Sequence, residues 1–126
     1  MAMRSYLGRV RGLGSNKEGS HHFWLERISA VALLPLLLWL IFSGVHVVGA
    51  DLATFKAWVA RAQNPVLLVL VVVVAFYHAA LGLQVIIEDY VSGEGAKLVT
   101  IVLVKFGCAL AAASGVYSVL KIAFGS

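Results

Sequence analysis

His78 is the residue of this sequence whose type and position most favour chemistry. It lies within a long apolar stretch, nine residues before the end of that stretch at Ile87. In a membrane-spanning helix, this distance places the imidazole about 13 Å from the end, inside the hydrocarbon. An uncharged imidazole there needs a hydrogen-bond partner or a metal, and haem iron is a natural occupant of a helix bundle. The small residues Ala79 and Gly82 would leave room for a flat macrocycle. Two interpretations stay open: an axial haem ligand, or a histidine hydrogen-bonded to a neighbouring helix.

Asp89 and Tyr90 lie at the polar end of the same stretch. Residues 78, 82, 85 and 89 are spaced so that they share one helix face, with Asp89 about 16 Å from His78 along the axis. A carboxylate and a phenol at the wet end of a span could deliver protons and a hydrogen bond to a quinone. The alternative is an interfacial tyrosine of an aromatic belt beside an acidic helix end.

His46 lies near the end of another apolar stretch, which crosses the membrane in the opposite direction. The predicted depths of His46 and His78 differ by about 13 Å, which is too far for one iron. If His78 binds haem, the second axial ligand must therefore come from another chain, either a second copy or a partner subunit. His46 itself is expected near the outer headgroups, and Lys105, about 10 Å inside a third stretch, is expected to extend to the interface.

Three apolar stretches, residues 28–48, 65–87 and 98–124, must position these side chains. Each exceeds the roughly 20 residues that a helix needs to cross the hydrocarbon. An open strand cannot satisfy its backbone hydrogen bonds in lipid, which argues against β structure even in the valine-rich stretch after Pro65. The sequence predicts an all-α, three-helix transmembrane bundle. It forms a single membrane-anchor domain, 1–126, with residues 1–27 as a cytoplasmic arm.

The composition supports a membrane protein and excludes several other classes. Hydrophobic residues make up 61% of the 126 residues and charged residues 13%, against roughly 25% charged in average soluble proteins. The single cysteine, Cys108, excludes a disulfide scaffold. The sequence has no phosphate-binding loop, zinc cluster or nucleophile triad, so this chain is not expected to catalyse a reaction alone.

Basic residues predict the orientation of the bundle. Six lie on the side of the amino terminus and the loop 88–97: Arg4, Arg9, Arg11, Lys17, Arg27 and Lys97. Three lie on the other side: Lys56, Arg61 and Lys121. The positive-inside rule makes the amino terminus cytoplasmic and leaves the carboxyl terminus on the outer side. Gly107, Ala111 and Gly115 form a small-residue stripe of the kind that packs against another helix.

Two segments of the sequence resemble a known family. Residues 77–91, YHAALGLQVIIEDYV, are similar to the H-x-x-x-G-x-x-x-x-x-x-D-Y signature of the hydrophobic membrane anchor subunit of succinate dehydrogenase. Residues 19–30, GSHHFWLERISA, resemble the segment that leads into that family's first helix.

The resemblance implies a four-subunit complex in a bacterial inner membrane, with the carboxyl terminus in the periplasm. This complex would oxidise succinate and reduce ubiquinone. The partners would be a flavoprotein, an iron–sulfur subunit and a cytochrome b anchor subunit. By the same resemblance, His78 would be one axial ligand of haem b, and Tyr90, with Asp89 beside it, would bind the quinone. Arg27 and His21 would lie near the haem propionates or the quinone. The alternatives are a fumarate reductase anchor, a homodimeric b-type cytochrome, and a structural membrane protein without a cofactor.

Overall fold

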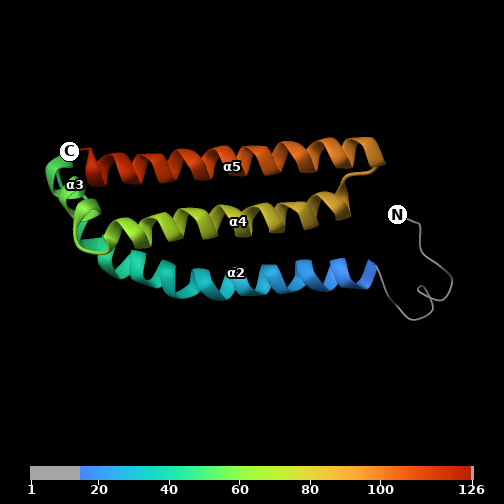
Figure 1. Ribbon diagram of the computed structural model, residues 1–126, viewed down its shortest axis with the longest axis horizontal. Helices are drawn as coiled ribbons and strands as arrows, with labels where there is room; N and C mark the ends of the chain where they lie inside the picture. The colour runs from blue at the N-terminus through green and yellow to red at the C-terminus, as the bar shows by residue number, and fades with distance from the viewer. Residues whose placement is uncertain (1–14, 126) are drawn as a thin grey trace.

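The computed structural model describes the backbone of residues 15–125 and the side chains of residues 20–125. Helices in this range are α2 (Ser15–Gly44), the 3-10 turn η1 (Val45–Val47), α3 (Leu52–Ala60), α4 (Asn64–Tyr90) and α5 (Glu94–Phe124). The three long helices run side by side with α4 in the middle, and α3 packs across one end (Figure 1). This arrangement confirms the predicted all-α, three-helix bundle. Arg4, Arg9 and Arg11 of the predicted arm lie outside the described residues.

All three long helices are long and apolar enough to cross a membrane. The candidate spans are Ser20–Val47, Asn64–Tyr90 and Glu94–Phe124. The buried apolar side chains of the described residues are few: Trp58, Val59, Val71, Leu81 and Ile87. Many large apolar side chains on all three spans are exposed instead. Such a surface suits lipid or other membrane chains rather than water.

The helices extend beyond the apolar stretches from which they were predicted. α2 begins at Ser15 rather than near residue 28, so residues 15–27 of the predicted arm belong to the helix. α4 continues to Tyr90, and α5 begins at Glu94, directly after Gly93 with its positive φ of 88°. Polar residues can continue a helix past the hydrocarbon because each backbone hydrogen bond is satisfied within the segment. Hydropathy therefore located the spans but not the helix ends.

The short helix α3 was not predicted, and it ties the first two spans together. Asp51 caps it by accepting a hydrogen bond from the Thr54 backbone N–H at 3.0 Å, and hydrogen bonding from Thr54 holds the pKa of Asp51 below its usual range. Trp58 stacks on Trp39 of α2 and donates through Nε1 to Ser43 Oγ at 3.0 Å. Asn64 donates to the Trp58 carbonyl at 2.7 Å. This bond joins the first residue of α4 to the end of α3.

Helices α4 and α5 approach closely at Gly115. A Cβ at Gly115 would lie 2.8 Å from Cγ1 of Val72, whereas a Cβ at Gly107 would meet nothing within 4 Å. The small-residue stripe therefore has its contact within this chain at Gly115, while Gly107 faces away from the rest of the described chain.

Replacing Gly115 by valine should loosen the α4–α5 contact, because the added side chain must displace Val72. We expect a destabilisation of about 1–3 kcal/mol, the usual cost of overpacking. The measurement is the thermal unfolding midpoint of the protein purified from membranes in mild detergent. Gly107→Val is the matched control and should leave the midpoint close to that of the wild type. Equal midpoints for the two variants would contradict this packing.

Candidate functional site

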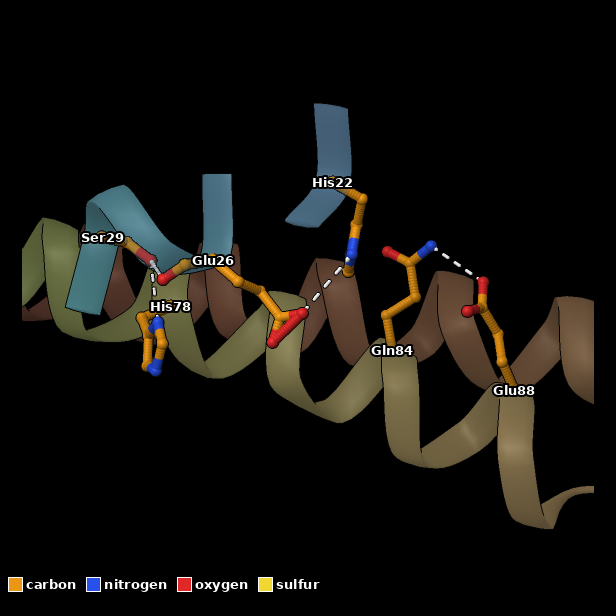
Figure 2. A network of polar contacts seen from close by, with 6 residues as sticks. All are labelled: His22, Glu26, Ser29, His78, Gln84 and Glu88. Carbon is orange, nitrogen blue, oxygen red and sulfur yellow. Dashed lines mark hydrogen bonds and ion pairs between the residues drawn. The ribbon is translucent and has the colours of Figure 1, made fainter. Parts of the chain in front are cut away.

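His78 is held by a hydrogen bond to the neighbouring helix α2. Its Nδ1 lies 2.7 Å from Oγ of Ser29, and that hydroxyl donates to the Glu26 carbonyl at 2.9 Å (Figure 2). A helical serine commonly donates a hydrogen bond to a carbonyl one turn earlier, and this bond orients the Ser29 hydroxyl independently of the imidazole. Ser29 is only 5% exposed. One of the two interpretations of the sequence was a histidine hydrogen-bonded to a neighbouring helix. The contact of Nδ1 with Ser29 agrees with that interpretation.

The other ring nitrogen, Nε2, is left for a further ligand. Figure 2 shows it on the side of the ring that points away from α2. Ala79 is exposed, and a Cβ built on Gly82 would meet nothing within 4 Å, so the helix face beside His78 is open. A flat group could approach Nε2 over these small residues. The donor chemistry and the open face fit an axial haem ligand.

Within residues 20–125, His78 is not part of a cluster of metal-ligating side chains. Among residues 20–125 there is no group of three or more His, Cys, Asp or Glu side chains that could hold an ion. His46 lies at the other end of the bundle. It is 17 residues beyond Ser29 along α2 and η1, roughly 25 Å at 1.5 Å per residue. Since His78 contacts Ser29, this gap is wider than the sequence estimate, and the two histidines cannot share an iron.

Asp89 and Tyr90 lie at the end of α4, directly before the turn to α5. Tyr90 is 82% exposed, and its hydroxyl makes no hydrogen bond within the described part of the chain. Asp89 is also exposed, and the neighbouring Glu88 accepts a hydrogen bond from Gln84 at 3.1 Å. The phenol is therefore available to a molecule or subunit outside this chain. Its distance from His78 is set by twelve helical residues, about 18 Å along the axis.

The remaining predicted residues do not gather around Tyr90. His21 lines a cavity of about 630 Å³ between α2, α4 and α5. Tyr77 and Gln84 also line it, together with Lys105, which was expected only to extend to the interface, and Cys108. Arg27 is exposed and lies over the Phe23 ring at 4.6 Å. Within the described residues, no hydrogen bond or ion pair joins His21 or Arg27 to His78 or Tyr90.

Ser29 and Glu26 are site residues that sequence reasoning missed. The side chain of Glu26 lies 3.6 Å from Nδ1 of His22, so a row of polar groups on α2 leads toward Ser29 (Figure 2). The sequence signal was small: Ser29 is a polar residue at the start of an apolar stretch, one helical turn after Glu26.

His46, at the other end of the bundle, lines a second cavity of about 690 Å³ together with Trp39, Trp58 and Arg61.

The family model and the similar proteins agree on the kind of protein that this chain resembles. The family described as succinate dehydrogenase/fumarate reductase transmembrane subunit matches residues 1–112. The succinate dehydrogenase hydrophobic membrane anchor subunit of Rickettsia bellii is 35% identical over 81% of this chain and 82% of its own length. The succinate dehydrogenase membrane anchor subunit of Reclinomonas americana is 35% identical over 71% and 77%. The corresponding hydrophobic subunit of Paracoccus denitrificans is 32% identical over 93% and 90%. No solved structure gives a match.

Proposed function

This chain belongs to the family of succinate dehydrogenase and fumarate reductase transmembrane subunits, and from this premise we propose that it supplies one half of a haem b site and part of a ubiquinone site. The observation that carries the proposal is His78, whose Nδ1 is bonded to Ser29 while Nε2 faces an open surface beside Gly82. We propose succinate oxidation as the physiological direction because the relatives are named as subunits of succinate dehydrogenase. The runner-up is a fumarate reductase anchor.

His78 would hold the haem through Nε2, while Ala79 and Gly82 keep the helix surface low enough for a planar ring. When bound, haem b would supply a centre that accepts and donates one electron. The contribution of this chain is to orient the imidazole through the contact between Nδ1 and Ser29. A second residue to hold the haem would come from a cytochrome b partner subunit, since His46 lies too far from His78 along α2 and η1.

Tyr90 would donate a hydrogen bond from its hydroxyl to a carbonyl oxygen of ubiquinone. Its exposure supports this role, because no group in the described part of the chain competes for the hydroxyl. Asp89, the adjacent residue, would hold a proton at its carboxylate and pass it toward the reduced quinone from the aqueous side. Arg27 and His21 would meet the haem propionates or the quinone only through surfaces completed by other subunits.

We propose that the end of the bundle carrying Tyr90 is cytoplasmic. The start of α2, the end of α4 and the start of α5 lie at this end (Figure 1). It carries Arg27 and Lys97, while Lys56, Arg61 and Lys121 belong to the opposite end, which would be periplasmic. The flavoprotein and iron–sulfur subunits would dock at the cytoplasmic end, next to the proposed quinone site.

Purification of the intact complex in mild detergent tests this proposal. We expect a flavoprotein, an iron–sulfur subunit and a second anchor to accompany this chain, with a reduced-minus-oxidised spectrum of a b-type haem. Succinate-dependent quinone reduction should be present in the same preparation. A preparation with haem but no flavin would favour a homodimeric cytochrome, and one with all four subunits but no haem would overturn the haem assignment.

A further inference from the structure

We infer that Ser29 is a positioning residue that fixes the tautomer of His78 and thereby lowers the reduction potential of the haem that His78 holds. This inference rests on the proposed function, because it concerns the ligand nitrogen of His78. The imidazole would present a bare Nε2 lone pair because Ser29 keeps the ring proton on Nδ1.

The hydrogen count supports this tautomer. A serine hydroxyl has one hydrogen, and Ser29 donates it to the Glu26 carbonyl at 2.9 Å. In the 2.7 Å contact with His78, the serine oxygen must then accept, and Nδ1 must donate. A neutral imidazole has only one N–H group, so Nε2 has none. An Nε2 without hydrogen is the form that binds a metal.

Partial burial strengthens the hydrogen bond between His78 and Ser29. Ser29 is 5% exposed and His78 is half-buried, so the contact is partly shielded from water. A hydrogen bond in a low-dielectric interior is stronger than one in water, and an unpaired N–H there is costly. Ser29 is positioned in turn by its own helix, through the bond to Glu26. The ring is therefore oriented before any ligand reaches it.

An acceptor on Nδ1–H makes the opposite nitrogen a better donor to a metal. A stronger donor stabilises ferric over ferrous iron, so the hydrogen bond from His78 to Ser29 lowers the potential of the haem. Loss of the acceptor should raise that potential and weaken haem retention, since partners of this kind typically change metal affinity about 10–100-fold. A tenfold change in the preference for ferric iron corresponds to about 59 mV for one electron.

The test uses the intact purified complex with Ser29→Ala and Ser29→Thr. Redox titration of the b-haem absorbance should give a higher midpoint for Ser29→Ala, with less haem per flavin. Ser29→Thr keeps a hydroxyl at the same place and should restore the wild-type midpoint. Ser118→Ala is the matched control, because Ser118 also bonds back to a helical carbonyl, at 2.8 Å, but contacts no histidine. It should leave the spectrum and the midpoint unchanged.

The outcomes separate the inference from the proposed function. A wild-type complex without b-type haem overturns the proposed function and the inference with it. A wild-type complex with haem, but with equal midpoints and haem contents in Ser29→Ala and the wild type, overturns the inference alone. If Ser29→Ala retains too little haem to titrate, Ser29→Cys replaces it, because sulfur is a weak acceptor. Its midpoint should then lie above that of Ser29→Thr, and equal values would overturn the inference.

Discussion

His78→Ala abolishes the b-type haem spectrum of the purified complex: we expect no reduced-minus-oxidised signal from this site. The variant removes the Nε2 lone pair, which is the group through which we propose that this chain would hold the haem. The remaining fold should tolerate the change, because Ser29 still donates to the Glu26 carbonyl after the imidazole is removed. The measurement is the difference spectrum together with the amount of haem per flavin.

His46→Ala is the control for this prediction. His46 is the other histidine on an apolar span, but it lies roughly 25 Å from Ser29 along α2 and η1, so its loss should leave the haem spectrum intact. A normal haem content in His78→Ala would show that this chain contributes no axial ligand. Loss of haem in both variants would point to general destabilisation of the bundle rather than to ligation.

The amino-acid sequence was sufficient to predict the bundle and the wide separation of His46 from His78. Length and hydropathy determine three spans, because a helix that satisfies its own backbone is the only way for these stretches to cross lipid. The depth of His78 on one span and of His46 on another follows from counting residues at a fixed rise. The prediction that the two histidines lie too far apart to share one iron could therefore be made before any contact was known.

The contact between Ser29 and His78 could not be derived in this way. It joins residues 49 positions apart, and it depends on how α2 is rotated about its axis against α4. In a soluble helix an apolar stripe predicts that rotation, but here apolar residues surround the spans and leave no clear stripe. The capped helix α3 was missed because its apolar residues lie between two longer stretches, outside the predicted spans.

Residues assigned by family resemblance also need not meet within one chain. His21 faces the cavity between the three long helices, while Tyr90 is exposed at the end of α4. A motif shared with a multisubunit family predicts residues for sites that several subunits would build together. The fold of one subunit shows only which of them this subunit brings together itself.

Tyr90→Phe should slow quinone reduction while leaving the haem in place. The substitution removes a hydroxyl and keeps the ring, so the apolar surface at the end of α4 changes little. A hydrogen bond to a group that gains charge contributes about 1.5–3 kcal/mol, which corresponds to a loss of about 10- to 100-fold in rate. The measurement is succinate-dependent quinone reduction in the purified complex, with the haem spectrum recorded on the same sample.

Two controls show whether this loss belongs to the quinone step. Electron transfer from succinate to a soluble dye that accepts electrons before the quinone should be unchanged, because Tyr90 would act only on the quinone itself. Tyr117→Phe removes the hydroxyl of another exposed tyrosine, which lies near the opposite end of the bundle on α5. The complex with Tyr117→Phe should reduce quinone at the wild-type rate. Normal quinone turnover in Tyr90→Phe would assign Tyr90 to the membrane interface, where an exposed phenol at a helix end needs no substrate.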